Sequence, residues 1–127
     1  MVISVETNTP QATSSGNWAP MSGLAITLPR GAGDSALVIL NVGAPWATGN
    51  NYPGGNFGLQ VNGKVIAVYG SFTYSEPQPP NPGRMPTTVV AAVPLSQSQT
   101  TAVVAVWSAI RGSTVRIDSP ATLSAII

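Results

Sequence analysis

The sequence predicts an all-β protein, a sandwich or jelly roll of about nine or ten short strands. Valine, threonine and isoleucine contribute 14, 12 and 8 of the 127 residues, and such branched side chains favour the pleated backbone of a strand. The 13 glycines and 12 prolines break the chain at short intervals, and no stretch between them keeps a helical apolar period. We therefore expect one domain, residues 1–127.

Three strands are expected in the first part of the chain. Val2–Glu6 starts the chain, and Leu24–Leu28 is the next clear run of branched and apolar residues. Ala36–Val42 is almost continuously apolar, a pattern typical of a central strand that is covered on both faces.

A β-hairpin is expected in the middle of the chain. Asn56–Val61 and Lys64–Tyr69 flank an Asn-Gly pair at 62–63. Both residues of the pair accept positive φ, so the pair favours a type I′ turn between two strands. A kink at Gly70 is expected before a short further strand, Ser71–Tyr74.

Four more strands are expected before the C-terminus, namely Thr87–Val93, Thr101–Trp107, Thr114–Ile117 and Ala121–Ile127. The last strand is apolar and ends in two isoleucines without a charged tail, so a free edge there would be prone to aggregation. It either packs against other copies of the chain or pairs inside its own sheet.

The first long connection, Gly43–Gly55, combines aromatic and amide side chains. Trp46 and Tyr52 stand close to Asn50 and Asn51. A sugar presents an apolar C–H face and a ring of hydroxyls, which suit an aromatic plane and amide groups respectively. The alternative is that the two aromatic residues form a small core of the loop and the asparagines form turns.

The second long connection, Ser75–Pro86, contains five prolines and Arg84. Tyr74 stands at its start, and Arg111 follows a later strand end. Guanidinium is a planar group of donors that can chelate neighbouring oxygens. Arg84 and Arg111 are therefore the candidate polar residues that hold a sugar in its site. The alternative is that they are arbitrary solubilising cations.

Composition excludes several classes of function. The net charge of +1 is too small for nucleic-acid phosphates or an anionic membrane surface. No apolar run is long enough to span a bilayer, and no cleavable signal peptide is visible. Cysteine and histidine are absent, so we expect no metal or other cofactor. With only 7% charged residues, the composition suggests self-association.

The carboxylates do not form a catalytic pattern. A glycosidase needs two acids that face one bond, and Glu76 with Asp118 is the one candidate pair. No spacing supports that pair, and Asp118 before Ser-Pro indicates a turn first. We expect no catalytic residues and no enzymatic activity.

From about residue 36 to the C-terminus, the order and spacing of several motifs resemble a known family. The motifs are Val38-Ile39-Leu40-Asn41-Val42, Pro45, Ala47-Thr48-Gly49-Asn50-Asn51, Pro53-Gly54, Phe72-Thr73-Tyr74-Ser75, Gly83-Arg84-Met85-Pro86, Arg111-Gly112-Ser113, Ile117-Asp118-Ser119 and Leu123-Ser124-Ala125-Ile126. The chain is similar to the tumour-necrosis-factor-like, fucose-binding bacterial lectins typified by the N-terminal domain of the Burkholderia superlectin.

The resemblance implies a non-enzymatic, metal-independent jelly-roll lectin that assembles as a homotrimer. Each sugar site would lie between two protomers, one donating Arg84 and its neighbour Tyr74 and Arg111. Fucosylated or related glycans would be the partners, at the surface of a bacterium or outside it.

Three positions depart from the family pattern and belong to the same expected site. Trp46 replaces a tyrosine and keeps the aromatic plane without the hydroxyl, and Asn56 replaces another tyrosine and removes an aromatic wall. Asn81 and the proline after it replace a Ser-Thr pair of the family, which removes a hydroxyl and a backbone N–H. The rival hypothesis is a structural trimerisation or adhesion module that binds protein through an exposed apolar patch.

Overall fold

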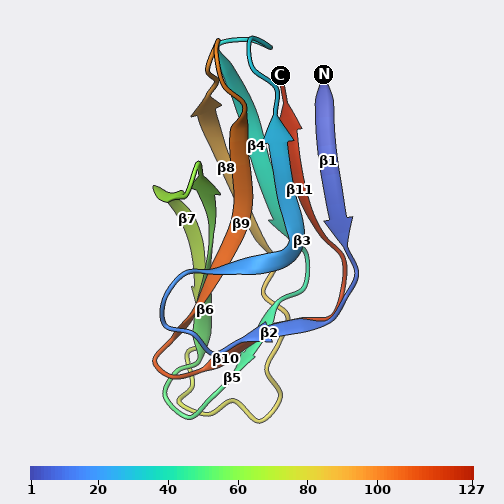
Figure 1. Cartoon of the computed structure of the whole chain (residues 1–127). Coiled ribbons are helices and arrows are strands. Elements are labelled where there is room, and N and C mark those ends of the chain that lie inside the picture. Colours follow the sequence, from blue (N-terminus) through green and yellow to red (C-terminus); the bar gives the residue numbers. More distant parts are fainter.

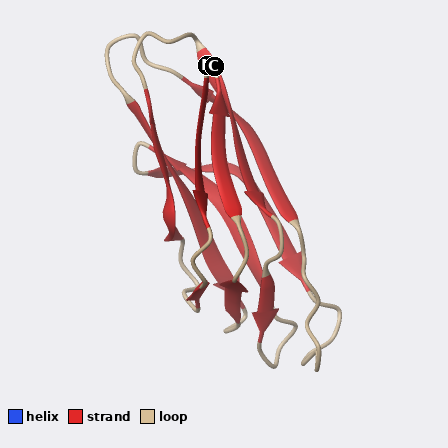
Figure 2. Cartoon of the chain, turned by 90° about the vertical axis from the view of Figure 1, so that its right-hand side faces the viewer, coloured by secondary structure: helices blue, strands red, loops and turns tan.

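The computed structural model describes residues 1–127 as eleven strands without a helix, arranged as two facing sheets and a small third one (Figures 1 and 2). The strands are β1 (Val2–Thr7), β2 (Gln11–Thr13), β3 (Ala19–Leu28), β4 (Ser35–Val42), β5 (Trp46–Thr48), β6 (Gly54–Val61), β7 (Lys64–Thr73), β8 (Thr87–Pro94), β9 (Thr101–Ile110), β10 (Thr114–Ile117) and β11 (Ala121–Ile126). No helix of the chain is long and apolar enough to cross a membrane.

The strand order is that of a jelly roll. One sheet runs β1-β11-β4-β8, the second runs β3-β9-β6-β7, and the short strands form β2-β10-β5. If the eight strands of the two large sheets are numbered along the chain, the orders become 1-8-3-6 and 2-7-4-5, the interleaving that two Greek keys produce. The predicted all-β jelly-roll class is confirmed.

A core of 24 buried residues fills the space between the sheets. It forms because alternate residues of each strand point inward, as in β8, where every second position from Val89 to Val93 is buried. The ring of Phe57 lies 6.2 Å from the ring centroids of both Phe72 and Trp107. Trp107 is therefore a core residue.

The central hairpin forms as predicted, but its second strand is longer. Asn62 and Gly63 have φ values of 48° and 85°, as a type I′ turn requires. β7 then continues to Thr73 without a break, so the expected separate strand Ser71–Tyr74 is wrong. A Cβ on Gly70 would lie 2.9 Å from Thr87 of β8, so this glycine lets two strands approach closely and does not mark a kink.

Two strands lie where the sequence analysis saw none. β5 falls inside the connection that was expected to be a loop, and β2 lies in the N-terminal stretch. Each has three residues and pairs with β10, which reaches both from the far end of the chain. β3 also begins five residues earlier than expected, with an irregularity in its pairing between Pro20 and Ala25.

β4 is central in its sheet, but the expectation that both its faces are covered is wrong. Its side chains alternate between buried and exposed, and Leu37 is 43% exposed. Val2, Ile126 and Leu37 stand side by side in register across β1, β11 and β4, and Val90 of β8 is exposed on the same face. These four residues are called the outer apolar face below.

The C-terminal strand pairs inside its own sheet. β11 lies between β1 and β4 and so has no free edge. Met1 and Ile127 lie side by side, since the terminal amino group donates to the Ile127 carbonyl at 2.9 Å. Figure 1 shows the two termini at one end of the sandwich and the small sheet and the Pro-rich loop at the other.

Candidate functional site

The Pro-rich loop, residues 75–86, is tied to the connection around β5 by backbone hydrogen bonds. The amide of Tyr52 donates to the carbonyl of Pro77 at 3.0 Å, and the amide of Met85 donates to the carbonyl of Pro45 at 2.8 Å. Proline restricts the backbone between these two ties. The loop is therefore held in place before any ligand arrives, which lowers the ordering cost of binding.

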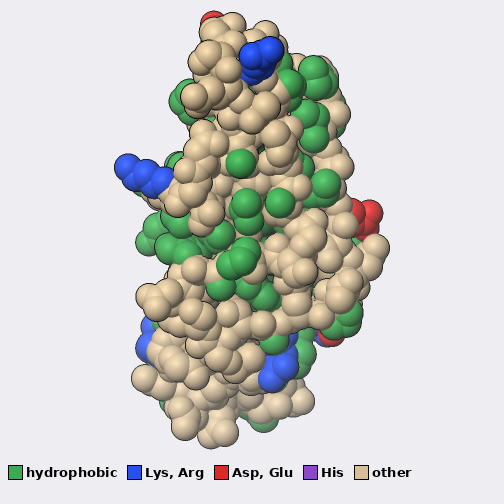
Figure 3. Space-filling model, viewed as in Figure 1, with side chains coloured by type: hydrophobic (Ala, Val, Ile, Leu, Met, Phe, Trp, Pro, Cys, Tyr) green, Lys and Arg blue, Asp and Glu red, His purple; other side chains and the backbone are tan.

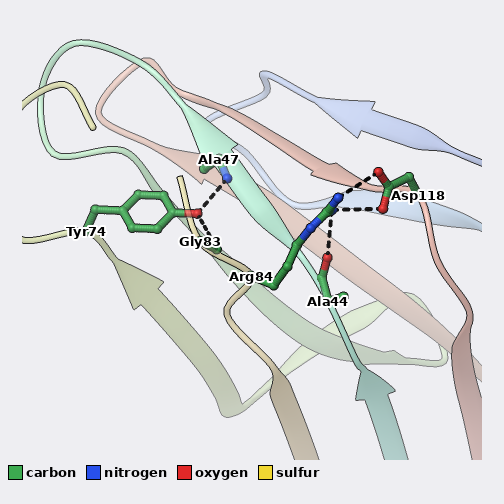
Figure 4. Close-up of polar contacts among 6 residues, drawn as sticks. All are labelled: Ala44, Ala47, Tyr74, Gly83, Arg84 and Asp118. Carbon is green, nitrogen blue, oxygen red and sulfur yellow. Dashed lines mark hydrogen bonds and ion pairs between the residues drawn. The ribbon is translucent and has the colours of Figure 1, made fainter. Parts of the chain in front are cut away.

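Tyr74 links the same two segments through its hydroxyl (Figure 4). The hydroxyl donates to the carbonyl of Gly83 at 2.6 Å and accepts from the amide of Ala47 at 3.2 Å. Burial raises the pKa of Tyr74, opposed in part by the Ala47 hydrogen bond and by the charge of Arg84. Tyr74 is thus placed beside the loop that carries Arg84 within one chain.

Arg84 forms a bidentate ion pair with Asp118. Its Nη1 and Nη2 donate to the two carboxylate oxygens at 2.8 and 3.0 Å, and Nη1 also reaches the carbonyl of Ala44 at 3.3 Å (Figure 4). The side chains remain 47% and 43% exposed. Asp118, interpreted from the sequence as a turn residue, holds Arg84 and does not pair with Glu76.

Trp46 lies in β5 and packs against two arginines. The guanidinium carbons of Arg84 and Arg116 lie 5.2 and 5.6 Å from the centre of its ring, within cation–π range. Arg116 is the register partner of Trp46 in β10. The ring is thus neither part of a loop core with Tyr52 nor an open plane, and its indole nitrogen is buried without a hydrogen-bond partner.

Arg111 is held at the turn between β9 and β10. Its φ is 50° and that of Gly112 is 70°, so the backbone turns through the left-handed region at both positions. Nε donates to the carbonyls of Asn51 and Tyr52 at 2.9 and 3.0 Å, and Nη2 contacts the Tyr52 carbonyl and the Thr73 hydroxyl. Arg111 is therefore a fixed group and not a free solubilising cation.

Close packing beside this turn explains why small residues occupy positions 113 and 54. The hydroxyl of Ser113 is buried and donates to the carbonyl of Gly54 at 2.8 Å, which joins the turn to the start of β6. A Cβ on Gly54 would lie 2.2 Å from the carbonyl oxygen of Phe72. Only glycine lets β6 and β7 approach each other here.

Asn56 is used inside the chain. The Ser71 hydroxyl donates to its Oδ1 at 2.6 Å, and its Nδ2 donates to the Ser108 hydroxyl at 3.0 Å. The amide thus bridges β7, β6 and β9. Asn81, by contrast, is exposed and its side chain makes no hydrogen bond within the chain.

Of the six residues predicted for the site, three lie in one cluster, Arg111 lies in a second, and Asn56 and Asn81 belong to neither. The Arg84 cluster contains Trp46, Tyr74 and Arg84, together with Asp118 and Arg116, which sequence reasoning missed. The Arg111 cluster contains Arg111 with its partners Asn51, Tyr52 and Thr73, and Thr73 directly precedes Tyr74 in the sequence. The signal that could have found Arg116 is the scarcity of charge, since it is one of only five cations.

Two hollows lie near these clusters. One, of about 370 Å³, is lined by Pro10, Gln11, Ala12, Trp46, Arg116, Ile117 and Asp118. The other, of about 400 Å³, is lined by Thr48, Gly49, Gln78, Pro79, Pro80 and Pro82. Both involve the end of the sandwich that carries the small sheet.

The arrangement suits a ligand rich in hydroxyl groups. Each hydroxyl is both a donor and an acceptor, and the Arg84–Asp118 pair presents guanidinium N–H groups beside carboxylate oxygens. Nη1 of Arg111 makes no hydrogen bond within the chain, so it is a further donor that a ligand can use.

Comparison with known proteins places the chain. Residues 8–126 match the family described as Bc2l-C, N-terminal domain. The chain belongs to this family. The family consists of lectin-type, carbohydrate-binding domains and not of enzymes, and the match confirms the resemblance found in the sequence motifs.

Solved structures add a likeness of fold. Dimeric latent PorU from Porphyromonas gingivalis superposes with a TM-score of 0.57 and 14% sequence identity. The likeness covers 98% of this chain but only 12% of the PorU chain. No curated protein sequence matches the chain.

Proposed function

We propose that this protein is a lectin without enzymatic activity that binds fucose or a related glycan as a homotrimer. Each site would form where Arg84 of one protomer meets Arg111 of the next. Tyr74, which the resemblance assigned to the same protomer as Arg111, is hydrogen-bonded to Gly83 beside Arg84 of its own chain. The observation that carries the proposal is that both guanidinium groups are exposed and yet held by several hydrogen bonds.

Fixed donors favour sugar binding for an energetic reason. A sugar hydroxyl gives up hydrogen bonds to water when it binds, so a site gains only where its own groups are already in position. Arg84 is oriented by Asp118, and Arg111 is oriented by the carbonyls of Asn51 and Tyr52. Neither side chain has to lose much freedom on binding.

The outer apolar face supports the trimer. Val2, Leu37, Val90 and Ile126 are between 43% and 68% exposed in the single chain, and they lie together on one sheet. Water contact with such a patch is unfavourable, and a patch of this kind on a soluble protein marks an interaction site. In the view of Figure 3, which presents the side of the molecule with β3 and β9 in front, the charged side chains are scattered among hydrophobic and other groups.

A trimer would make weak sites effective. A wet, shallow sugar site has low affinity on its own, but three sites on one rigid body gain avidity on a dense glycan surface.

The residue at position 56 affects which sugar binds. Both ends of the Asn56 amide are hydrogen-bonded within the sheet, so Asn56 offers less to a sugar than an aromatic side chain would. We therefore expect a ligand preference that differs from that of relatives with tyrosine there.

The test is a glycan array with the wild-type protein and with Arg84→Ala and Arg111→Ala. We expect the array signals to disappear in both variants while the assembly in solution is retained. Free monosaccharide at millimolar concentration should compete with the wild-type signal. Unchanged signals in both variants would refute the site, and a wild-type protein that binds no glycan but captures a protein would favour the adhesion module.

A further inference from the structure

The cavity of about 370 Å³ beside the small sheet is lined by charged and aromatic side chains. Not all of these side chains take part in the proposed sugar site. Trp46, Arg116 and Asp118 line it from β5, from β10 and from the turn after β10. It is also lined at the start of β2 by Pro10, Gln11 and Ala12. Arg116 is the charged lining residue that the proposed sugar site does not use.

The positive charge of Arg116 is not compensated within the chain. Arg84, on the same tryptophan ring, is neutralised by its bidentate pair with Asp118. The half-buried side chain of Arg116 makes no ion pair and no hydrogen bond. A guanidinium in that position keeps its N–H donors for an outside acceptor.

Trp46 supplies a second unused donor. Its indole nitrogen is buried without a partner, and an unpartnered buried donor is unusual enough in a folded protein to indicate a missing acceptor. The Trp46 side chain and the uncompensated positive charge of Arg116 therefore both belong to the lining of this cavity. Because Arg84 neutralises Asp118, the carboxylate there does not present a bare negative charge to a ligand.

We propose that this cavity takes the anionic group, a carboxylate or a sulfate, of an acidic sugar unit. The guanidinium of Arg116 would donate two parallel hydrogen bonds to two oxygens of this anionic group. This inference rests on the proposed lectin function and deepens it, because it names the class of glycan. The neutral unit would be held by Arg84 and Arg111, and the acidic unit by Arg116 next to it.

The experiment compares one oligosaccharide in three forms with the whole protein. Fucosyl-lactose, its sialylated form and its 3-sulfated form are titrated into wild-type protein and into Arg116→Gln. We expect an acidic form to bind wild type about tenfold more tightly than the neutral form, which corresponds to about 1.4 kcal/mol, and to lose this preference in Arg116→Gln. Arg30→Gln, which removes one exposed positive charge in the loop between β3 and β4, is the matched control and should keep it.

The outcomes separate the two proposals. If the wild-type protein binds none of the three sugars, the lectin function fails. If it binds the neutral sugar without any preference for the acidic forms, or if Arg116→Gln keeps the preference, the inference is overturned. A preference lost equally in Arg30→Gln reflects net charge alone and also overturns it. Capture of an acidic peptide but of no acidic sugar would assign the cavity to a protein partner instead.

Discussion

Arg84 and Asp118 are 34 residues apart in the sequence and form two parallel hydrogen bonds of 2.8 and 3.0 Å. The pair joins the Pro-rich loop to the end of β10, so that two connections of the jelly roll meet at one point. Because both side chains are about half exposed, the pair contributes little to stability. Its effect is to orient a donor fork at the surface.

Asp118→Asn tests this orienting role. We expect the free energy of unfolding to fall by less than about 1 kcal/mol, because exposed ion pairs rarely contribute more. Glycan affinity should fall more strongly, since Arg84 loses its bidentate partner. Urea denaturation and titration calorimetry measure the two effects, and Asp34→Asn in the loop after β3 is the control. A variant that binds glycan as tightly as wild type would exclude the role.

Arg111 allows the backbone and the side chain to be separated. Its φ of 50° is unfavourable for any residue with a Cβ, and glycine adopts it freely. Both Arg111→Gly and Arg111→Ala lose the guanidinium contacts to Asn51 and Tyr52. We expect the glycine variant to be more stable than the alanine variant by about 1 kcal/mol. Equal urea midpoints for the two variants would mean that the turn relaxes to another conformation.

Tyr74 makes stability dependent on pH in the alkaline range. Burial raises its pKa above the ordinary 10.0, so above that pH the unfolded chain loses the phenolic proton before the folded chain does. The stabilisation is complete below pH 10 and is lost as the pH rises through the folded-state pKa. Tyr74→Phe should cost about 1 kcal/mol at pH 7, through the lost hydrogen bonds. This difference between wild type and variant should shrink from pH 10 upward, and a constant difference in unfolding free energy would contradict the prediction.

The outer apolar face should control assembly. In sedimentation we expect wild-type protein at about three times the 13.0 kDa chain mass, and Leu37→Glu at the mass of one chain. A glutamate there would bury an unpaired charge in the interface, which is strongly unfavourable. Val68→Glu, at a residue 48% exposed on β7 of the other sheet, should leave the mass unchanged. A Leu37→Glu protein that still sediments as wild type would place the interface elsewhere.

Local patterns in the sequence predicted most of the large sheets. β10 has the bounds expected from Thr114–Ile117, and the turn at Asn62 and Gly63 has the expected φ values. These features depend on neighbours within a few residues, so propensity and alternation are enough to predict them. β5 escaped prediction because three residues carry no periodic signal and its pairing partner is about 70 residues further along the chain.

The candidate site shows the same division. Scarcity of charge drew attention to Arg84 and Arg111, the two long connections drew attention to Trp46 and Tyr74, and the family pattern supplied Asn56 and Asn81. Asp118 and Arg116 were missed, because a turn acid and a strand cation are unremarkable until folding brings them to Trp46 and Arg84. The uncovered face of β4 was missed as well. An apolar run has the same sequence pattern whether its second face packs inside the chain or lies on the outside of the single chain.

The amino-acid sequence by itself determined that the chain is all-β, that its function requires neither strong charge nor histidine or cysteine chemistry, and which lectin-like family it resembles. The tertiary structure alone decided which guanidinium is paired, which is free and which sheet face is left uncovered. The physical reason is distance along the chain: strand propensity and turn geometry act between near neighbours, whereas ion pairs and surface patches are made by residues that only the folded topology brings together.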